Sequence, residues 1–308
     1  MNTIHLKYAV EIEKSGSIMR AAENLFMGQP TLSKTIRELE TYLGFKIFER
    51  TNKGVVPTEK GEEFLEYAKR ILSEVERIEQ IALEDDERMQ KLVIAAPRAT
   101  YIAHTFAKFV SDLDPDKKID ITYKETNAMR TINKISIGEY HLGIIRYQTE
   151  YENYFTDFLR KKKFRLEPLY EFDALALMNK NHPLAEKERL EYSDFAGCTE
   201  LLHADNIVPY FAAPGNTAPG SDKHVYIFER GTQFELLDMV PDSYIWVSPL
   251  PQEILDRYSL VQRKCNHPSG CMKDMLVCLD DYKPTQTEKE FLKELKKTIK
   301  SVSSMEFK

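Results

Sequence analysis

The chain has 308 residues, 42% hydrophobic and 30% charged, which is enough for about two domains with buried cores. This balance excludes a disordered or collagen-like chain, and no apolar run approaches the roughly 18 to 20 residues of a membrane span. Four cysteines are too few for a disulfide framework, and the first 20 residues carry charges where a signal peptide would be apolar. We therefore expect a cytoplasmic protein.

The net charge of −6 is unevenly distributed along the chain. Residues 1–60 hold nine Lys or Arg against seven Asp or Glu, whereas residues 61–90 hold four against ten. An average over several domains can hide a local basic surface, so the overall acidity does not exclude nucleic-acid binding. We expect a small basic unit, an acidic segment and a large, nearly neutral domain, in that order.

Two helical patterns joined by a tight turn come first, at Ser17–Leu25 and Gln29–Leu43. Small or apolar residues fall where the two helices would cross, which leaves polar and basic side chains on the outer face of the second helix. Proline is tolerated in the first helical turn, where backbone N–H groups can also meet a phosphate. The pattern predicts a helix-turn-helix. Its DNA-facing residues would be Gln29, Pro30, Thr31, Ser33, Lys34 and Arg37.

Residues 48–58 form two short β-prone pieces around a turn. Such a hairpin can act as a wing beside the DNA backbone, with Arg50 and Lys53 contacting phosphates, although a solvated hairpin is the simpler alternative. An amphipathic helix pair alone would be weak evidence of DNA binding. The order of helix pair, hairpin and long helix is much more specific.

A long helix is predicted from Thr58 to about residue 86, because apolar residues recur there at alternating spacings of four and three. Thr58 can cap its start. The apolar stripe could dock on its own domain, but no comparable amphipathic partner lies beside it in the sequence, which favours pairing with a second copy. The predicted dimerisation residues are Phe64, Ala68, Ile71, Val75 and Ile78.

After Met89, β-rich runs alternate with helical stretches, which indicates an α/β region with mostly parallel strands. The predicted strands are residues 91–96, 119–124, 141–145, 174–178, 224–228 and 244–247. The predicted helices are residues 99–110, 128–137, 233–240, 252–258 and 287–299. Residues 211–222 are rich in Pro and Gly and are predicted to form a loop.

The first 72 residues closely resemble the LysR-type transcriptional regulators, and the resemblance extends over the whole chain. The matching motifs include Arg20-Ala21-Ala22-Glu23, Gln29-Pro30-Thr31-Leu32-Ser33, Phe48-Glu49-Arg50 and Thr58-Glu59-Lys60-Gly61. Met27-Gly28 departs from the more usual Val-Ser, so a hydroxyl cap for the second helix is missing. The resemblance implies an α/β protein with a winged helix-turn-helix, a dimerising linker helix and a two-lobed effector domain like a periplasmic binding protein. The resemblance places the DNA-binding domain at 1–58, the linker helix at 59–88 and the effector domain at 89–308. Within the effector domain, lobe I would comprise about 91–163 plus 267–308, and lobe II about 164–266.

The two-lobed plan places a ligand between the lobes. In open α/β sheets, ligands bind beyond the carboxyl ends of strands and near helix N-termini. The candidates at such positions are Arg98, Thr100, Thr126, Asn127, Arg146, His203 and Trp246. The two arginines favour an anionic effector. The simpler alternatives are a surface charge for either arginine, helix capping for Thr100 and core packing for Trp246.

Cys265, His267 and Cys271 suggest a metal or redox site, but they include no CxxC pair and lack the spacing of a zinc ribbon. Isolated cysteines are usually small buried hydrophobes. The family's peroxide sensors use paired cysteines, whereas Cys198 has no neighbour at a matching short spacing. No catalytic motif is visible, so we expect neither an enzyme nor a cofactor or metal.

We therefore expect a sequence-specific transcriptional regulator that binds duplex DNA as a homodimer or homotetramer. It would respond to a small anionic effector, act on the transcription machinery and have no membrane partner. The alternative is a small-molecule binding protein whose N-terminal helices only mediate assembly. That alternative predicts no salt-dependent affinity for DNA.

Overall fold

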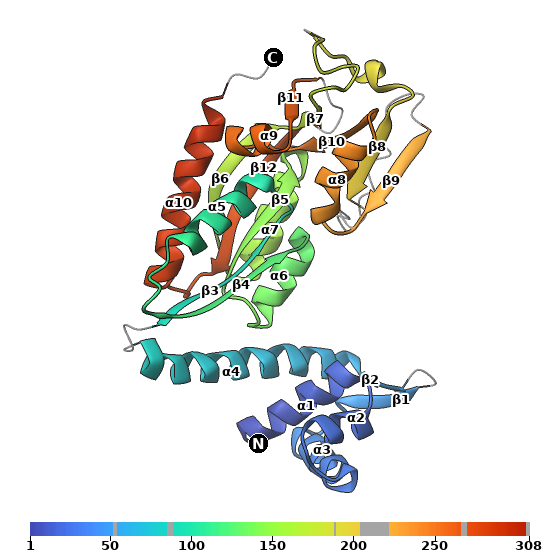
Figure 1. Ribbon diagram of the computed structural model, residues 1–308. Coiled ribbons are helices and arrows are strands. Elements are labelled where there is room, and N and C mark those ends of the chain that lie inside the picture. Colours follow the sequence, from blue (N-terminus) through green and yellow to red (C-terminus); the bar gives the residue numbers. More distant parts are fainter. Residues whose placement is uncertain (52–53, 85–88, 188, 204–221, 266–269, 306–308) are drawn as a thin grey trace. The chain divides into compact units, whose positions relative to one another are not determined.

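The computed structural model describes residues 1–51, 54–84, 89–187, 189–203, 222–265 and 270–305 (Figure 1). The chain divides into two compact units. The first comprises Met1–Met89 with Asn133–Tyr140, and the second Gln90–Ile132 with His141–Lys308. No helix among the described residues is both long and apolar enough to cross a membrane.

Three short helices, a hairpin and a long helix make up most of the first unit. They are α1 (Thr3–Ser15), α2 (Ile18–Asn24), α3 (Gln29–Leu43), β1 (Phe48–Thr51), β2 (Gly54–Pro57) and α4 (Glu59–Glu84). Small residues let α2 approach its neighbours closely, since Ala21 and Ala22 are buried together with Leu32 and Ile36 of α3. The predicted helix pair is thus present, with its apolar face buried as expected.

The helix α3 begins at Gln29 although no side chain caps it. Gly28 is the N-cap residue, and its carbonyl accepts from the N–H groups of Thr31 and Leu32 at 3.0 and 3.1 Å. The missing hydroxyl therefore does not shift the start of the helix. At the other end Gly44 stops α3 in the left-handed conformation, with φ of 77°.

The hairpin β1–β2 is held against the end of α1. Val55 N–H donates to the Gly16 carbonyl at 3.0 Å, and a Cβ on Gly54 would lie only 2.7 Å from that carbonyl oxygen. Gly54 also has φ of 115°, which side chains disfavour. Glycine at this position therefore lets the hairpin approach α1.

Two five-stranded sheets form the centre of the second unit. The first has the order β4-β3-β5-β12-β6, and the second β11-β7-β10-β8-β9. Their strands are β3 (Met89–Ala96), β4 (Lys118–Glu125), β5 (Leu142–Gln148), β6 (Phe164–Asp173), β7 (Leu175–Asn179), β8 (Thr199–His203), β9 (Lys223–Ile227), β10 (Ser243–Val247), β11 (Leu260–Arg263) and β12 (Cys271–Leu279). The helices are α5 (Thr100–Ser111), α6 (Ala128–Ser136), α7 (Glu152–Lys161), α8 (Gly231–Met239), α9 (Gln252–Arg257) and α10 (Gln286–Ser303), with short 3-10 turns at Thr149–Tyr151 and Tyr192–Phe195.

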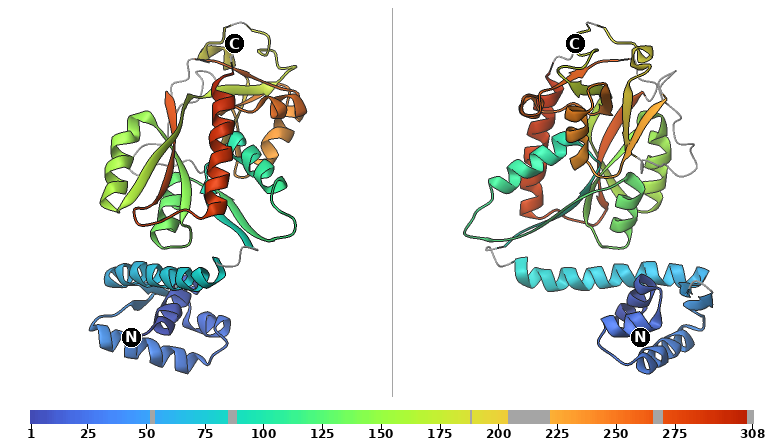
Figure 2. Two further views of the ribbon diagram at one scale, coloured as in Figure 1. Left: turned by 90° about the vertical axis from the view of Figure 1, so that its left-hand side faces the viewer. Right: turned by 45° about the vertical axis from the view of Figure 1, so that its right-hand side comes forward.

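Helices cover both faces of the first sheet. On one face α5 and α10 lie side by side (Figures 1 and 2), and their rings of Phe109 and Phe291 meet edge to face at 5.6 Å. On the other face Phe155 of α7 stacks on Tyr147 of β5 at 4.7 Å. Both faces of the central strand β5 are therefore buried, which explains why its first four residues, Leu142–Ile145, carry no polar side chain.

The predicted parallel strands are present, but each sheet also contains one strand that runs against its neighbours. β12 runs antiparallel to β5 and β6, and β7 runs antiparallel to β10 and β11, while β3–β5, β8–β9 and β8–β10 are parallel. The chain passes from the first sheet to the second at β7 and returns to the first at β12. Each of these two strands runs antiparallel to both of its neighbours in the sheet, so both sheets are mixed.

The lobe boundary also differs from the expected one. β6 pairs with β12 from Phe164 opposite Leu279 to Asp173 opposite Cys271, so residues 164–173 belong to the first sheet. The change of lobe therefore falls after Asp173 rather than at residue 164. The loop predicted at residues 211–222 lies, except for Asp222, outside the described residues.

Candidate functional site

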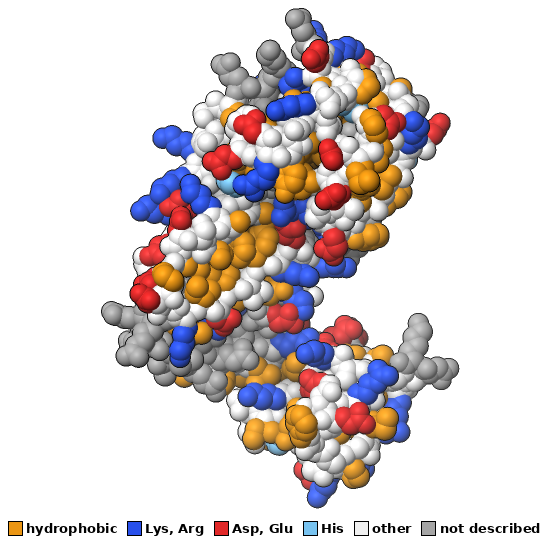
Figure 3. Space-filling model, in the orientation of Figure 1, with side chains coloured by type: hydrophobic (Ala, Val, Ile, Leu, Met, Phe, Trp, Pro, Cys, Tyr) orange, Lys and Arg blue, Asp and Glu red, His pale blue; other side chains and the backbone are white. Residues whose placement is uncertain are grey.

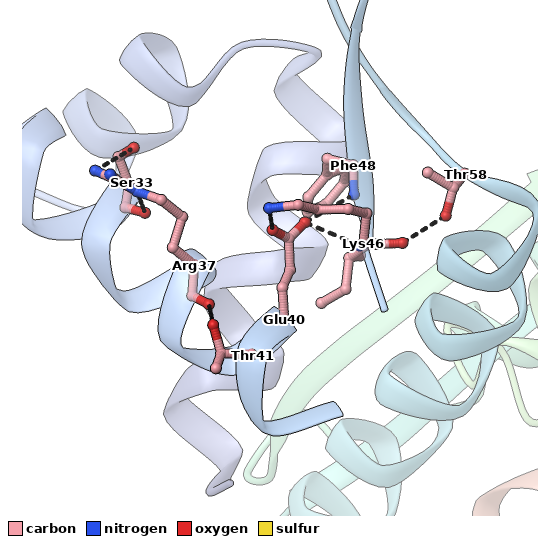
Figure 4. A network of polar contacts seen from close by, with 8 residues as sticks. Ser33, Arg37, Glu40, Thr41, Lys46, Phe48 and Thr58 are labelled. Atoms are coloured by element: carbon pink, nitrogen blue, oxygen red, sulfur yellow. Dashed lines mark hydrogen bonds and ion pairs between the residues drawn. The ribbon is translucent and has the colours of Figure 1, made fainter. Parts of the chain in front are cut away.

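The outer face of α3 presents polar and basic side chains to solvent. Gln29, Pro30, Thr31, Lys34 and Arg37 are exposed, and Ser33 is half-buried. Arg37 lies back along the helix, because its Nε donates to the Ser33 carbonyl at 3.2 Å and its Nη2 to the Ser33 hydroxyl at 3.5 Å (Figure 4). The six predicted DNA-facing residues thus share one helix, and five of them are well exposed.

Charges of both signs lie on this surface. Lys34 Nζ lies 3.8 Å from a Glu38 carboxylate oxygen, with both side chains well exposed. An exposed pair of this kind contributes at most about 1 kcal/mol, so it leaves Lys34 available to another partner. Figure 3 shows basic and acidic side chains interspersed over the first unit, in keeping with its small net charge.

A buried carboxylate ties the segment before the hairpin to α3. Glu40 Oε1 accepts from the backbone N–H groups of Ile47 at 2.9 Å and Phe48 at 3.2 Å, and Lys46 Nζ lies 2.7 Å from Oε2 (Figure 4). The Thr58 hydroxyl donates to the Lys46 carbonyl at 2.6 Å and accepts from Gly61 N–H, so Thr58 caps α4 as predicted. No sequence pattern pointed to the role of Glu40.

This attachment gives β1 a defined place beside α3. The Arg50 side chain is exposed on β1, and its backbone pairs with Val55 of β2. Lys53, the other predicted phosphate contact, lies outside the described residues. The attachment therefore fixes the start of β1, the strand that carries Arg50, against the C-terminal half of α3.

The two halves of α4 have different surroundings. Ala68 is only 1% exposed and Phe64 is partly buried against the core of the first unit, so these two predicted dimerisation residues pack within the chain. Ile71 and Ile78 remain 42% and 66% exposed, and Val75 is half-buried. Tyr67, which the sequence reasoning missed because it lies one position off the predicted stripe, is 58% exposed.

Strand ends from both sheets of the second unit meet. Arg98, after β3, donates through Nη2 to the carbonyl of Phe228, after β9, at 2.6 Å. Glu125, at the end of β4, pairs with Arg230 beside the start of α8 at 2.7 Å. The sequence reasoning did not single out Glu125 and Arg230, since it could not reveal a pair between residues 105 positions apart.

Three more predicted effector residues lie at these strand ends. Thr126 follows β4 and its N–H donates to the Ala96 carbonyl of β3 at 2.9 Å, which brings the two loops together. Asn127 Oδ1 accepts from Arg130 N–H at the start of α6. His203 ends β8 opposite Ile227 of β9.

The remaining candidates have mainly structural surroundings. Arg146 makes two 2.7 Å hydrogen bonds to Asp274, which is fully buried, and Tyr101 also donates to that carboxylate. Its guanidinium is thus already neutralised. Thr100 is 5% exposed and is the first residue of α5, whose N-cap is Ala99, so it does not act as the cap.

Trp246 belongs to an aromatic cluster in the second sheet, with its ring 5.3 Å from Phe195 and 5.8 Å from Tyr244. The carboxyl of Glu200 lies in the same cluster and is 1% exposed. Burial raises the pKa of Glu200 to about 7, although the polar groups of Trp246 and Tyr244 beside it oppose that rise. These contacts favour packing as the role of Trp246.

The four thiols show no sign of activation. Burial raises the pKa of Cys198, Cys271 and Cys278, and raises that of Cys265 to about 11. A reactive cysteine needs a lowered pKa, because the thiolate is the nucleophile. His267 lies outside the described residues, and among the described ones no three His, Cys, Asp or Glu side chains group as metal ligands.

Residues 4–62 match the family model of the bacterial regulatory helix-turn-helix protein, lysR family. Among curated relatives, a hydrogen peroxide-inducible genes activator of Pectobacterium carotovorum subsp. carotovorum is 27% identical over 206 residues. That alignment covers 67% of this chain but 65% of the relative, just under two thirds of its length.

Solved structures resemble the whole chain in fold. ArgP from Mycobacterium tuberculosis is 14% identical with a TM-score of 0.60, and the match covers 99% of this chain and 98% of that one. Full-length CbnR in complex with its target DNA is 16% identical with a TM-score of 0.57, covering 97% of this chain and 100% of that one. The helix-turn-helix match and the shared full-length fold agree with the motifs of the first 72 residues. The chain therefore carries a lysR-family helix-turn-helix at residues 4–62 and shares the fold of full-length LysR-type regulators.

Proposed function

We propose that the protein is a sequence-specific DNA-binding transcriptional regulator whose second unit senses a small-molecule effector. The observation that carries this proposal is the exposed face of α3, where Gln29, Thr31, Lys34 and Arg37 are presented by a buried helix-turn-helix core. Short polar side chains suit base edges in the major groove, and basic side chains suit phosphates. CbnR, which shares the fold, was solved with its target DNA.

The test is the enrichment of duplexes from a random-sequence pool, followed by binding measurements across a salt series. We expect affinity to fall steeply with salt. Thr31→Ala and Ser33→Ala should relax sequence preference, whereas Arg50→Ala should weaken all sequences alike. Arg189→Ala removes an exposed arginine of the second unit and is the matched control. Failure to enrich any sequence, or affinity independent of salt, would favour the small-molecule binding protein whose N-terminal helices only mediate assembly.

The oligomer that we propose forms through the exposed stripe of α4. Tyr67, Ile71 and Ile78 follow one another at spacings of four and seven residues, which places them on one side of the helix, and they carry apolar surface that the chain itself does not cover. Two-fold pairing along this stripe would match paired half-sites in DNA. Ile71→Glu with Ile78→Glu should dissociate the oligomer in analytical ultracentrifugation, whereas Glu66→Gln should leave it intact.

The effector that we propose is anionic and binds where the strand ends of the two sheets meet. Arg98 and Arg230 supply the positive charge, with Thr126, Asn127 and His203 alongside. Arg146 is left out, since Asp274 already neutralises it. Calorimetry against a panel of dicarboxylates and sugar phosphates is the test. Arg98→Ala and Arg230→Ala should abolish the heat of any probe that binds, and Arg189→Ala should not.

The curated relative's name raises peroxide sensing as another candidate. The raised thiol pKa values argue against it, because a peroxide-sensing cysteine needs thiolate character. Cysteine-to-serine variants should therefore retain the wild-type regulatory response. Loss of the regulatory response in Cys198→Ser would instead favour peroxide sensing over the sensing of an anionic effector.

A further inference from the structure

Phe26 occupies an unusual position in the turn between α2 and α3. Its side chain is 97% exposed, the highest exposed fraction among the large hydrophobic side chains of the described residues. Its backbone has φ of 53°, in the left-handed region that side chains rarely adopt. Neighbouring hydrogen bonds hold this turn, since Phe26 N–H donates to the Glu23 carbonyl at 3.1 Å and Met27 N–H to the Ala22 carbonyl at 2.9 Å.

Neither folding nor solubility accounts for phenylalanine at this position. A helix that ends in the left-handed conformation usually places Gly or Asn there, because both avoid the steric penalty of other side chains. The phenyl ring gains no burial in return. Backbone strain at such a residue tends to persist at functional sites, where the side chain is needed for contact with a partner.

The position of the turn indicates what that partner is. Phe26 lies three residues before Gln29, the first residue of α3, and Pro30 beside it is also exposed. The N-terminal residues of a recognition helix contact base edges in the major groove. A phenyl ring cannot pair with a phosphate, whereas the 5-methyl group of thymine is the apolar group that the major groove presents.

We propose that Phe26 is a specificity-determining residue that packs against a thymine 5-methyl group beside the bases that α3 reads. The inference rests on the proposed DNA-binding function. It adds an apolar contact to a surface that otherwise offers hydrogen bonds and charge. Thymine at one position of each half-site is therefore required for full affinity.

The experiment uses the full chain and duplexes that the wild type enriches from a random-sequence pool. Each duplex is also copied with dUTP in place of dTTP, which removes every thymine methyl group. Phe26→Asn keeps a residue that tolerates the left-handed backbone but removes the ring. Phe26→Leu retains an apolar side chain, and Tyr42→Gln, which removes a 71% exposed ring at the far end of α3, is the matched control.

We expect Phe26→Asn to bind the thymine duplex about 5- to 30-fold more weakly than the wild type. On the uracil copy the two proteins should bind nearly equally. The salt dependence of Phe26→Asn should match that of the wild type, because no phosphate contact is lost. Its melting temperature should not fall, since asparagine relieves backbone strain. Phe26→Leu should keep part of the preference for thymine, and Tyr42→Gln should behave as the wild type.

Three results would overturn the inference while leaving the proposed function intact. They are unchanged affinity of Phe26→Asn for the thymine duplex, an equal loss on both duplexes, and a lowered melting temperature that accounts for the loss. If Phe26→Asn instead altered only the oligomeric state, the ring would belong to a protein contact and the inference would also fail. If the wild type enriched no duplex at all, the proposed function itself would fail.

Discussion

Replacing Glu40 should release the wing segment from the recognition helix. Its side chain is 7% exposed, and one oxygen accepts from the N–H groups of Ile47 and Phe48. In Glu40→Ala these two buried N–H groups have no acceptor, and each unsatisfied group lowers the free energy of unfolding by about 1–3 kcal/mol. The ion pair with Lys46 adds little, because that lysine is 68% exposed. We therefore expect the free energy of unfolding to fall by about 2–6 kcal/mol.

Glu40→Gln separates the hydrogen bonds from the charge. The glutamine oxygen can still accept from both N–H groups, so about 1 kcal/mol should be lost. Glu38→Ala removes a 63% exposed glutamate two positions away and should change stability by less than about 0.5 kcal/mol. Denaturant unfolding followed by circular dichroism gives the free energies. Amide hydrogen exchange reports locally on residues 47 and 48, which should exchange faster in Glu40→Ala.

Two outcomes would refute this reasoning. If Glu40→Ala and Glu40→Gln were equally destabilised, charge rather than hydrogen bonding would hold the segment. If Glu40→Ala lost less than about 0.5 kcal/mol and its two amides stayed protected, the segment would be held by its apolar contacts alone.

Further predictions concern three other sites. Gly61→Ala should destabilise the first unit by at least about 1–3 kcal/mol in denaturant unfolding, since its Cβ would lie 2.0 Å from the Ile47 carbonyl oxygen. Arg146→Ala should lose about 3–5 kcal/mol by leaving buried Asp274 unpaired. The triple variant Arg146→Met, Asp274→Leu and Tyr101→Phe, which also removes the hydroxyl that donates to Asp274, should recover most of this loss; no recovery would contradict this account. Burial raises the pKa of Glu200 from 4.5 to about 7, so the folded state binds the extra proton between these values and stability should fall as pH rises from 4.5 to 7. Thermal melts of Glu200→Gln should lack this part of the pH dependence; an unchanged profile would exclude Glu200 as its source.

Local pattern was sufficient to predict α3 and its outer face. The spacing of apolar residues at three and four positions identifies the buried side of a helix without knowledge of its partner. The same reasoning placed the start of α3 at Gln29 and the cap of α4 at Thr58. Along α4 it was less exact, because it could not show which side of the stripe α1 would cover. Ala68 is therefore buried within the chain and Tyr67 is exposed.

Features that depend on strand register were beyond sequence reasoning. Proline inside an apolar run usually argues against a strand. Pro168 lies within β6, which is absent from the predicted strands. The structure accommodates it on the edge of the first sheet, with a register shift opposite Asp274 and Met275. The pairing of Arg146 with Asp274, 128 residues away, likewise depends on the antiparallel alignment of β5 and β12.

Burial explains why the two ion pairs of the second unit have different roles. Asp274 is fully buried and Arg146 is 15% exposed, so separating them would leave a charge in a medium where solvation is costly. Glu125 and Arg230 keep 18% and 22% exposure, and each can exchange its partner for water or for another ion at lower cost. The anionic effector that we propose would therefore displace Glu125 from Arg230 but not Asp274 from Arg146. The first pair is suited to a response and the second to holding β5 and β12 in register. Arg146 and Arg230 thus differ in the depth at which the fold buries their carboxylate partners.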